Sequence, residues 1–421
     1  MRGTRLFKLM DRCVGIPLVW LLGLLVRLCY WKKAPERFLA EGDHVLGVKS
    51  SALGDTLLLL PVLKALKQRV GPQGRVTVIA TDINEAVLRN NPSVDRLFVM
   101  DFGTFIRNPL CFFSFVRQLR AEKTQVALDF DQWLRISPLL CFLSGAPARI
   151  GFKTRGQFRH YLYNLCVVND TEKHESEQFA DLACLAGVSQ GKIETYSGFL
   201  KRETLFSTQL EQPSGAAKKP LVHFHPGCGI HGWQRAWPVE YYVGLALKLN
   251  AELGASIRLT GMGQYEEDLA GQIQQLSGID MDNRCGRLDL AQLTALLEED
   301  DLVVCGNTGI MHLAVGLDRP LVALHGPTNP VKWGPGPAST YALVERNLAR
   351  PIGQGWEEIK GQKSSNARVL RANLPCSPCL TLGFEYACPL RPCMEGIEVN
   401  IVYRECLAAL SKYLIESGRI N

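Results

Sequence analysis

A polar turn at Asn307-Thr308-Gly309 carries residue types that suit the binding of a phosphate group. An apolar run precedes it at 302–305, and apolar residues at helical spacing follow it to position 317. Such a turn places unpaired backbone N–H groups and the positive end of a helix dipole at the carboxyl edge of a parallel sheet. The candidate anion donors are therefore the backbone N–H groups of Thr308, Gly309 and Ile310.

A second loop, residues 325–330, follows the next apolar run and reads His-Gly-Pro-Thr-Asn-Pro. It is richer in special-backbone residues than an ordinary connection. We expect Gly326 and Thr328 in this loop, together with His312 in the preceding helix, to complete a phosphate or diphosphate site. The alternative is that an α/β protein repeats this unit several times, mostly without a ligand.

Residues 50–66 predict a polar turn that leads into an amphipathic helix, after a strand predicted over 44–49, and Asp55 lies at the start of that helix. A carboxylate at that edge could take a proton from a reacting hydroxyl group. Aspartate is also common as the N-cap of a helix. The residues alone leave the two interpretations open.

Basic residues gather after a short strand at 150–152. Lys153 and Arg155 come first, and Arg159 and His160 follow. This cluster could contact an anionic acceptor, or it could be a solvated basic face.

Four cysteines lie close together in a Gly- and Pro-rich tail, at Cys376, Cys379, Cys388 and Cys393. Four thiolates that include one C-x-x-C pair could bind a structural zinc, and less readily an iron–sulfur cluster. Free thiols or a disulfide are the alternatives, because the spacing after the first pair is irregular.

An apolar segment at 13–31 has basic residues on both sides, including Arg12 and Lys32. Arg27 interrupts it, and it is about as short as a spanning helix can be. We expect a helix that lies in the membrane interface, where basic flanks attract anionic lipid. A transmembrane helix and an ordinary packed helix are the alternatives.

The bulk properties narrow the class of protein. A chain of 421 residues with 47% hydrophobic content can form two or three domains. The net charge of +6 is mild, and no basic run with interleaved aromatic residues indicates nucleic-acid binding. The 14 cysteines are scattered along the chain, which favours a reducing compartment.

The chain contains two successive series of alternating strands and helices. This pattern predicts an α/β fold with two tandem Rossmann-like domains. Four domains follow: an apolar helix at 1–43, an acceptor domain at 44–205, a donor domain at 206–350 and a Cys-rich tail at 351–421. The expected strands are at 44–49, 75–80, 97–100, 126–129, 150–152, 221–225, 256–260, 302–305 and 321–324. A closing helix is expected at 398–417.

Four stretches resemble glycosyltransferase family 9, the lipopolysaccharide heptosyltransferases and their relatives. They read KSSALGDTLLLLP, FHPGCGIHGWQRAWP, TGMGQYEEDLA and NTGIMHLAVGLDRPLVALHGPTNP, and in order and spacing they cover 45–335. The resemblance implies the B-type glycosyltransferase fold and an inverting transferase that needs no catalytic metal.

The resemblance also implies roles for single residues. Asp55 would be the general base, and Ser50 and Ser51 would join Lys153 and Arg155 in binding the acceptor. Arg235 would contact the donor phosphate. Glu266, or its neighbour Glu267, would receive the ribose hydroxyls. Asn307 departs from the family pattern, which usually has aspartate there; this puts heptose as the sugar in doubt.

The expected function is transfer of a sugar, with heptose from ADP-heptose as the leading choice, onto a lipopolysaccharide core or a related lipid-linked saccharide. The expected partners are a nucleotide sugar, that acceptor and the membrane surface, with no nucleic acid. The expected location is cytoplasmic, on the inner face of the cytoplasmic membrane. A transferase for another nucleotide sugar and a catalytically silent binding protein are the alternatives.

Overall fold

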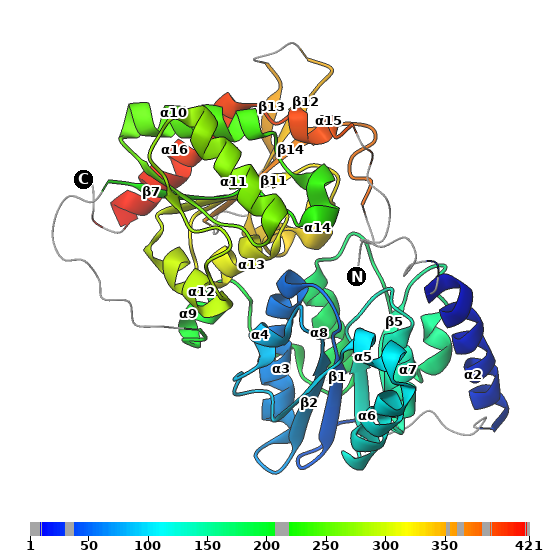
Figure 1. The fold of residues 1–421 in the computed structure, drawn as a ribbon. Helices are drawn as coiled ribbons and strands as arrows, with labels where there is room; N and C mark the ends of the chain where they lie inside the picture. The colour runs from blue at the N-terminus through cyan, green and yellow to red at the C-terminus, as the bar shows by residue number, and fades with distance from the viewer. Residues whose placement is uncertain are drawn as a thin grey trace. The chain divides into compact units, whose positions relative to one another are not determined.

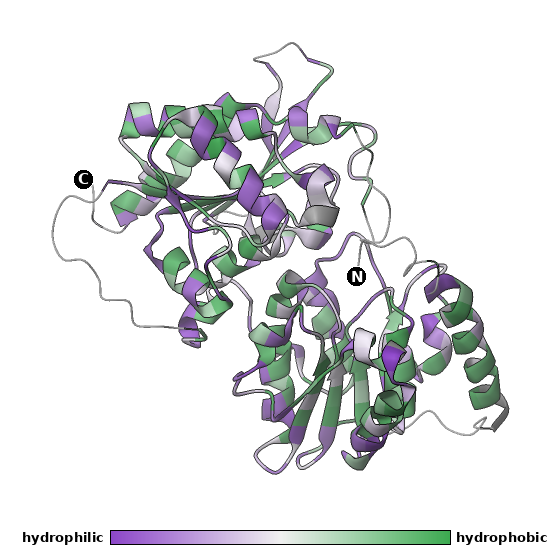
Figure 2. Cartoon of the chain, viewed as in Figure 1, coloured by the Kyte–Doolittle hydropathy of each residue, from purple (hydrophilic) through white to green (hydrophobic). Residues whose placement is uncertain are grey.

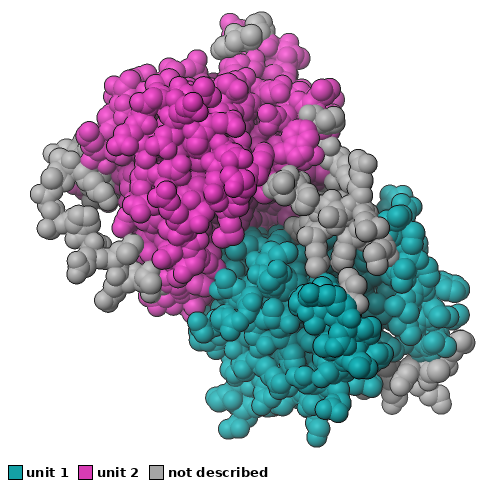
Figure 3. Space-filling view, in the orientation of Figure 1, with its two compact units in different colours: residues 1–170, 175–195 teal, residues 171–174, 196–421 magenta. Residues whose placement is uncertain are grey.

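The computed structural model describes residues 9, 11–29, 38–206, 219–350, 354–359, 366–380, 388, 390–416 and 418. These residues form two compact units. Unit 1 comprises Met1–Asp170 and Glu175–Thr195, and unit 2 comprises Thr171–His174 and Tyr196–Asn421. Figure 1 shows the elements of each unit, and Figure 3 colours the two units separately.

Unit 1 contains a sheet of six described strands, in the order β3-β2-β1-β4-β5-β6, and every pairing is parallel. The strands are β1 (His44–Val48), β2 (Arg75–Ala80), β3 (Arg96–Val99), β4 (Val126–Asp129), β5 (Ala148–Lys153) and β6 (Leu165–Val168). The helices are α2 (Ile16–Cys29), α3 (Leu53–Val70), α4 (Glu85–Leu88), α5 (Phe102–Arg107), α6 (Pro109–Ala121), α7 (Ile136–Leu143) and α8 (Glu175–Leu185). Three short helical turns are η1 (Asp11–Gly15), η2 (Arg159–Leu162) and η3 (Gln190–Lys192).

Unit 2 contains a sheet of eight described strands, in the order β13-β12-β14-β11-β10-β7-β8-β9. The strands are β7 (Leu221–His225), β8 (Ser256–Leu259), β9 (Asp282–Asn283), β10 (Leu302–Gly306), β11 (Leu321–His325), β12 (Ala342–Asn347), β13 (Trp356–Ile359) and β14 (Ala367–Asn373). The helices are α9 (Phe199–Arg202), α10 (Val239–Leu253), α11 (Gln264–Ser277), α12 (Leu290–Glu299), α13 (Gly309–Gly316), α14 (Pro330–Trp333), α15 (Pro392–Glu395) and α16 (Val399–Glu416). Two 3₁₀ turns are η4 (Ile230–Arg235) and η5 (Ala338–Thr340).

The central strands are rich in apolar residues because helices cover both faces of each sheet. All of the residues of β4, β10 and β11 are buried. Figure 2 shows this apolar character along the strands. The expected alternation of strands and helices around parallel strands is confirmed, and the antiparallel pairing of β12 with β13 lies at one end of the unit 2 sheet.

The region that we expected to form a Cys-rich tail contributes to the sheet of unit 2. Strand β14 lies between β11 and β12 and is parallel to both. The C-terminal helix α16, expected at 398–417, packs against the same core through Val402, Cys406 and Leu410. These residues therefore belong to unit 2. Most of the linker that we expected at 201–220 lies outside the described residues.

Helix α2 packs on unit 1 through one side only. Val19 is fully buried against Leu139 and Leu162. The chain just before the helix is fixed by an ion pair between Asp11 and Arg135. The other side leaves these apolar residues exposed: Val14 in η1, and Leu18, Trp20, Leu21, Leu24 and Leu25 in α2. In the described part of the chain, no helix is long and apolar enough to cross a membrane.

Candidate active site

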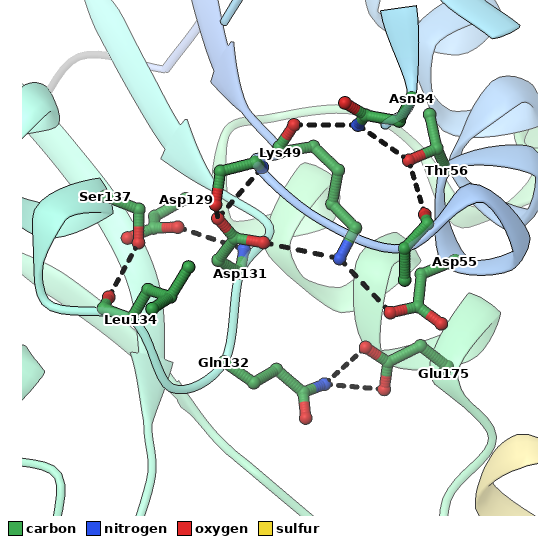
Figure 4. Close-up of polar contacts among 12 residues, drawn as sticks. Lys49, Asp55, Thr56, Asn84, Asp129, Asp131, Gln132, Leu134, Ser137 and Glu175 are labelled. Atoms are coloured by element: carbon green, nitrogen blue, oxygen red, sulfur yellow. Dashed lines mark hydrogen bonds and ion pairs between the residues drawn. The ribbon is translucent and has the colours of Figure 1, made fainter. Parts of the chain in front are cut away.

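The strand order of the unit 1 sheet reverses at β1. The strands β2 and β3 lie on one side of β1, and β4, β5 and β6 lie on the other. In open α/β sheets, ligands bind at the carboxyl edge next to such a point. The residues that follow β1 and β4 meet at this edge, and Figure 4 shows the polar side chains that they bring together.

Asp55 is the third residue of α3, and it is only 6% exposed. Its Oδ2 atom lies 3.3 Å from the ammonium nitrogen of Lys49. The N-cap of α3 is Ala52, so the interpretation of Asp55 as the cap is wrong. A carboxylate in the first turn is nevertheless favoured by the helix dipole.

Asp131 is a second carboxylate at this edge, and the sequence analysis missed it. It lies two residues beyond β4, and its Oδ1 atom is 3.4 Å from the same Lys49 nitrogen. Its Oδ2 atom accepts hydrogen bonds from the backbone N–H of Ser50, at 2.9 Å, and from the Ser50 hydroxyl. Ser50 therefore fixes Asp131, and its hydroxyl group is used inside the protein.

The other residues assigned to the acceptor differ in their surroundings. The buried Ser51 hydroxyl has no hydrogen-bond partner among the residues that the structure describes. Lys153 ends β5, and both it and Arg155 are exposed at the same edge of the sheet. Lys153 and Arg155 are therefore accessible to an acceptor, whereas the Ser51 hydroxyl is buried and its hydrogen-bonding capacity is unused among the described residues.

Arg159 does not belong to an exposed basic cluster. Its guanidinium is fully buried and lies 2.7 Å from the carboxylate of Asp129. Burial raises the pKa of Asp129, and the adjacent Arg159 opposes that effect. For Arg159, the interpretation of this cluster as an acceptor site or as a solvated face is wrong, because the residue pairs inside the fold.

In unit 2 the strand order reverses between β7 and β10. Arg235 reaches across this edge from η4, which follows β7. Its Nη1 atom donates to the carbonyl oxygen of Asn307, at 3.1 Å, and its Nη2 atom donates to that of Cys228, at 3.2 Å. The loops after both strands thus hold a guanidinium at the edge where α13 begins.

The expected turn from strand to helix is present, with β10 ending at Gly306 and α13 beginning at Gly309. Thr308 is the N-cap in an extended conformation, and its side chain makes no capping hydrogen bond. The Asn307 side-chain amide donates to the carbonyl oxygen of Trp333, at 2.6 Å. An ionised aspartate has no proton to donate, so this contact gives a local reason for asparagine at position 307.

Glu266 is buried in the first turn of α11, whereas Glu267 is exposed. One Glu266 oxygen accepts from the N–H of Gly229, at 2.7 Å, and the other accepts from the N–H of Met262, at 2.8 Å. The carboxylate therefore ties the loop after β7 to the loop after β8. A ribose would meet an acceptor that is already fixed in place.

The loop after β11 packs against the Cys-rich segment. A side-chain carbon at Gly326 would lie 2.3 Å from the sulfur of Met394, so a larger residue there would force the Met394 side chain to move. The backbone N–H of Cys379 donates to the Pro327 carbonyl, at 2.9 Å, and the Ser377 hydroxyl donates to that of Gly326, at 2.7 Å. The C-x-x-C segment thus holds this loop.

Two histidines lie behind the same loop. His325 is fully buried, and burial lowers its pKa to about 3, with the neighbouring His312 adding to the effect. The Thr328 hydroxyl lies 3.3 Å from His325 Nδ1. His325 is therefore neutral at physiological pH, and His312 is also buried.

The four tail cysteines lie in the described part of the chain, and each has a free thiol. Burial raises the pKa of Cys379, and Cys388 and Cys376 lie close enough to add to that effect. No group of three or more His, Cys, Asp or Glu side chains that could hold a metal ion is found among the described residues. The structural zinc stays a prediction.

A family model described as glycosyltransferase family 9 (heptosyltransferase) matches residues 112–351, which is more than half of the chain. The chain belongs to this family. It is therefore a glycosyltransferase, as its motifs indicated. Lipopolysaccharide heptosyltransferase 2 of Salmonella typhimurium is 27% identical to this family 9 enzyme over 299 residues, or 68% of this chain and 83% of the relative.

Solved structures agree with the fold of this family 9 enzyme. A family 9 glycosyl transferase from Veillonella parvula superposes with a TM-score of 0.65 at 18% identity, covering 90% of this chain and all of the other. The Escherichia coli ADP-heptose lipopolysaccharide heptosyltransferase II gives a TM-score of 0.58 at 22% identity, covering 88% of this chain and 99% of the other.

Proposed function

We propose that this glycosyltransferase moves a heptosyl group from ADP-heptose to the core saccharide of lipopolysaccharide, with inversion at the anomeric carbon. The names of its relatives support the choice of sugar and acceptor. The observation that carries the proposal is the position of Asp55, a buried carboxylate beside a buried ammonium at the edge where such sheets bind ligands.

Asp55 would act as the general base. It would accept the proton of the attacking acceptor hydroxyl while the bond between the sugar and the diphosphate breaks on the opposite face. Ser51, Lys153 and Arg155 would bind the acceptor, since one is a buried hydroxyl without a partner among the described residues and two are exposed cations at the same edge.

The edge of unit 2 around α13 would bind the nucleotide diphosphate. The leaving group develops negative charge, which fixed donors stabilise. Arg235 supplies a cation, and the first backbone N–H groups of α13 supply donors at the positive end of the helix dipole. The buried Glu266 would receive the ribose, and the residues around His312, Gly326 and Thr328 would support the phosphate loop. No metal would be needed for catalysis.

We also propose that α2 attaches the enzyme to the cytoplasmic face of the membrane. The exposed apolar side of η1 and α2 carries Leu18, Trp20, Leu21 and Leu25, while Val19 fastens the helix to unit 1. An amphipathic helix with basic flanks binds an anionic interface in this way. Attachment would keep the enzyme on the surface that contains a lipid-linked acceptor.

Purified enzyme, lipopolysaccharide from a strain that lacks core heptose, and a panel of nucleotide sugars test the function. We expect mass spectrometry to show acceptor that has gained one heptose with ADP-heptose, in the presence of a chelator. The configuration at the new anomeric carbon should be opposite to that of the donor. Transfer from a different nucleotide sugar would support the first alternative, and tight donor binding without any turnover would support a binding protein.

A further inference from the structure

Lys49 is a buried cation that has no role in the general-base mechanism proposed above. The residue is 1% exposed, and its ammonium nitrogen lies between two carboxylates, 3.3 Å from Asp55 and 3.4 Å from Asp131. A buried ammonium is stable only when it is paired, because burial removes its water. Figure 4 shows the lysine side chain extending between the two acids.

The two carboxylates are held differently. Asp131 accepts from the Ser50 N–H and the Ser50 hydroxyl in addition to Lys49, and its own N–H donates to Asp129, at 3.0 Å. It is therefore fixed to the end of β4 and to the turn after β1. Asp55 comes from α3, and the Lys49 ammonium connects it to this fixed acid.

The other acids near Lys49 have partners of their own. Asp129 is paired with Arg159, and Glu175 of α8 accepts two hydrogen bonds from the Gln132 amide, at 2.6 and 2.5 Å. The charged groups at this edge are thus Asp55, Asp129, Asp131, Arg159 and Glu175, together with the exposed Lys153 and Arg155. Only Asp55 and Asp131 form ion pairs with Lys49 among the described contacts.

We propose that Lys49 and Asp131 are positioning residues that set the strength of Asp55 as a base. This proposal rests on the proposed role of Asp55. The ammonium favours the ionised form of Asp55 and points its carboxylate, whereas Asp131 offsets part of that positive charge and so keeps Asp55 basic enough to take a proton.

The charge balance through the reaction explains why two acids share one lysine. The acceptor oxygen forms a bond to the sugar, its proton moves to Asp55, and the bond to the diphosphate breaks with its electron pair. The three side chains then change from a net charge of −1 to neutral. Lys49 keeps Asp131 as its counter-ion, so the buried ammonium is never left without a partner.

The proposal predicts shifts of opposite sign in the pH profile of kcat/KM. An opposite or like charge within a few ångströms changes the proton affinity of a carboxyl group by about one to three pH units. In Lys49→Met, the acidic limb should therefore move to higher pH by about that amount. In Asp131→Asn it should move to lower pH, and the plateau should fall because a weaker base transfers the proton more slowly.

The experiment measures kcat and KM from pH 5 to 9 for the wild type, Lys49→Met, Lys49→Arg and Asp131→Asn. Lys49→Arg keeps the charge, so its acidic limb should stay near that of the wild type, and it should be more active than Lys49→Met, which lacks the cation that points the Asp55 carboxylate. The loss should appear in kcat, and the affinity for ADP, which binds unit 2, should stay within about twofold of the wild type.

Glu122→Gln is the matched control. Glu122 is a buried acid of unit 1 that forms ion pairs with Arg75 and Arg96, the first residues of β2 and β3, at the opposite edge of the sheet. The Glu122→Gln variant should have a lower melting temperature than the wild type and an unchanged pH profile of kcat/KM.

Three outcomes would overturn the proposal: a wild-type pH profile in Lys49→Met, limbs that move in the same direction in the two variants, or losses that follow the folded fraction alone. A wild type that shows no transfer would instead refute the proposed function, and with it the basis of this inference.

Discussion

The guanidinium of Arg235 donates a hydrogen bond to the main-chain carbonyl of Asn307, at 3.1 Å, and so connects the loops after β7 and β10. The cation sits where the first turn of α13 begins. Arg235 is thus placed by backbone carbonyl groups, and it forms no ion pair with another described residue.

We therefore expect Arg235→Ala to weaken ADP binding about 10-fold or more, because it removes a cation near the diphosphate. Calorimetry measures this affinity. Arg404→Ala is the control, since Arg404 is an exposed arginine of α16 in the same unit and its removal changes the net charge equally. Equal affinities in the two variants would place the diphosphate elsewhere.

The acid sensitivity of unit 2 should depend on His325. Its pKa is about 3 in the folded protein and 6.5 for the free side chain, so the unfolded chain binds a proton that the folded chain excludes between these values. The contribution of the neutral, buried histidine is fully present above pH 6.5 and is lost as the pH falls toward 3. At pH 5 the loss is about 2 kcal/mol.

His325→Asn removes this titration and keeps an acceptor for the Thr328 hydroxyl. The variant is less stable at pH 7, but the difference in melting temperature from the wild type should narrow as the pH falls from 7 to 5. Carboxyl groups common to both proteins cancel in the comparison. A difference that stays constant or widens would contradict the assignment of His325 as a buried neutral group.

The exposed side of α2 should bind lipid. Leu21→Glu with Leu25→Glu should abolish sedimentation with anionic liposomes and leave the melting temperature nearly unchanged, since both residues are exposed. The control is Leu276→Glu, an exposed leucine of α11 in unit 2. If the double variant still sediments, the membrane contact is elsewhere.

A change on the buried side of α2 should affect the stability of the protein and not its binding to lipid. Val19→Ala should lower stability by about 1–2 kcal/mol while liposome binding persists, because Val19 packs against Leu139 and Leu162. For this reason, point changes on the helix test the membrane proposal more cleanly than deletion of the segment.

The zinc prediction is tested by elemental analysis of the purified protein. A zinc site would give one zinc per chain that is lost in Cys376→Ser, and Cys166→Ser, which removes an exposed cysteine elsewhere, would retain it. Loss of zinc should also weaken ADP binding, because the same segment holds the Gly326–Pro327 loop. Absence of zinc, with the four tail thiols free to react, would contradict the prediction.

The sequence predicted the central strands of both sheets because they are short apolar runs that alternate with helices, but it predicted neither their order nor β6, β9 and β13. It predicted β10 and α13 to within one residue at each end. Strands β12 and β14 escaped notice because charged residues, such as Glu345 and Arg371, interrupt them. Their polar side chains pair across the sheet, which a local pattern does not reveal.

Part of the candidate site depends on contacts between distant positions. Lys49 and Asp131 are 82 residues apart in the chain, and they meet because β1 and β4 are neighbours in the sheet. The sequence therefore indicated Asp55 through its motif but gave no sign of its connection to Asp131. Likewise, Arg159 looked like part of a basic face until the fold placed it beside Asp129.

The most direct test of this account is the turnover of Asp55→Asn with ADP-heptose and heptose-deficient lipopolysaccharide. Asparagine keeps the size of the side chain but removes the base, so kcat should fall by about 10²- to 10⁴-fold while the affinity for ADP stays unchanged. Turnover within a few fold of the wild type would show that Asp55 takes no proton, and the account of the active site would be wrong.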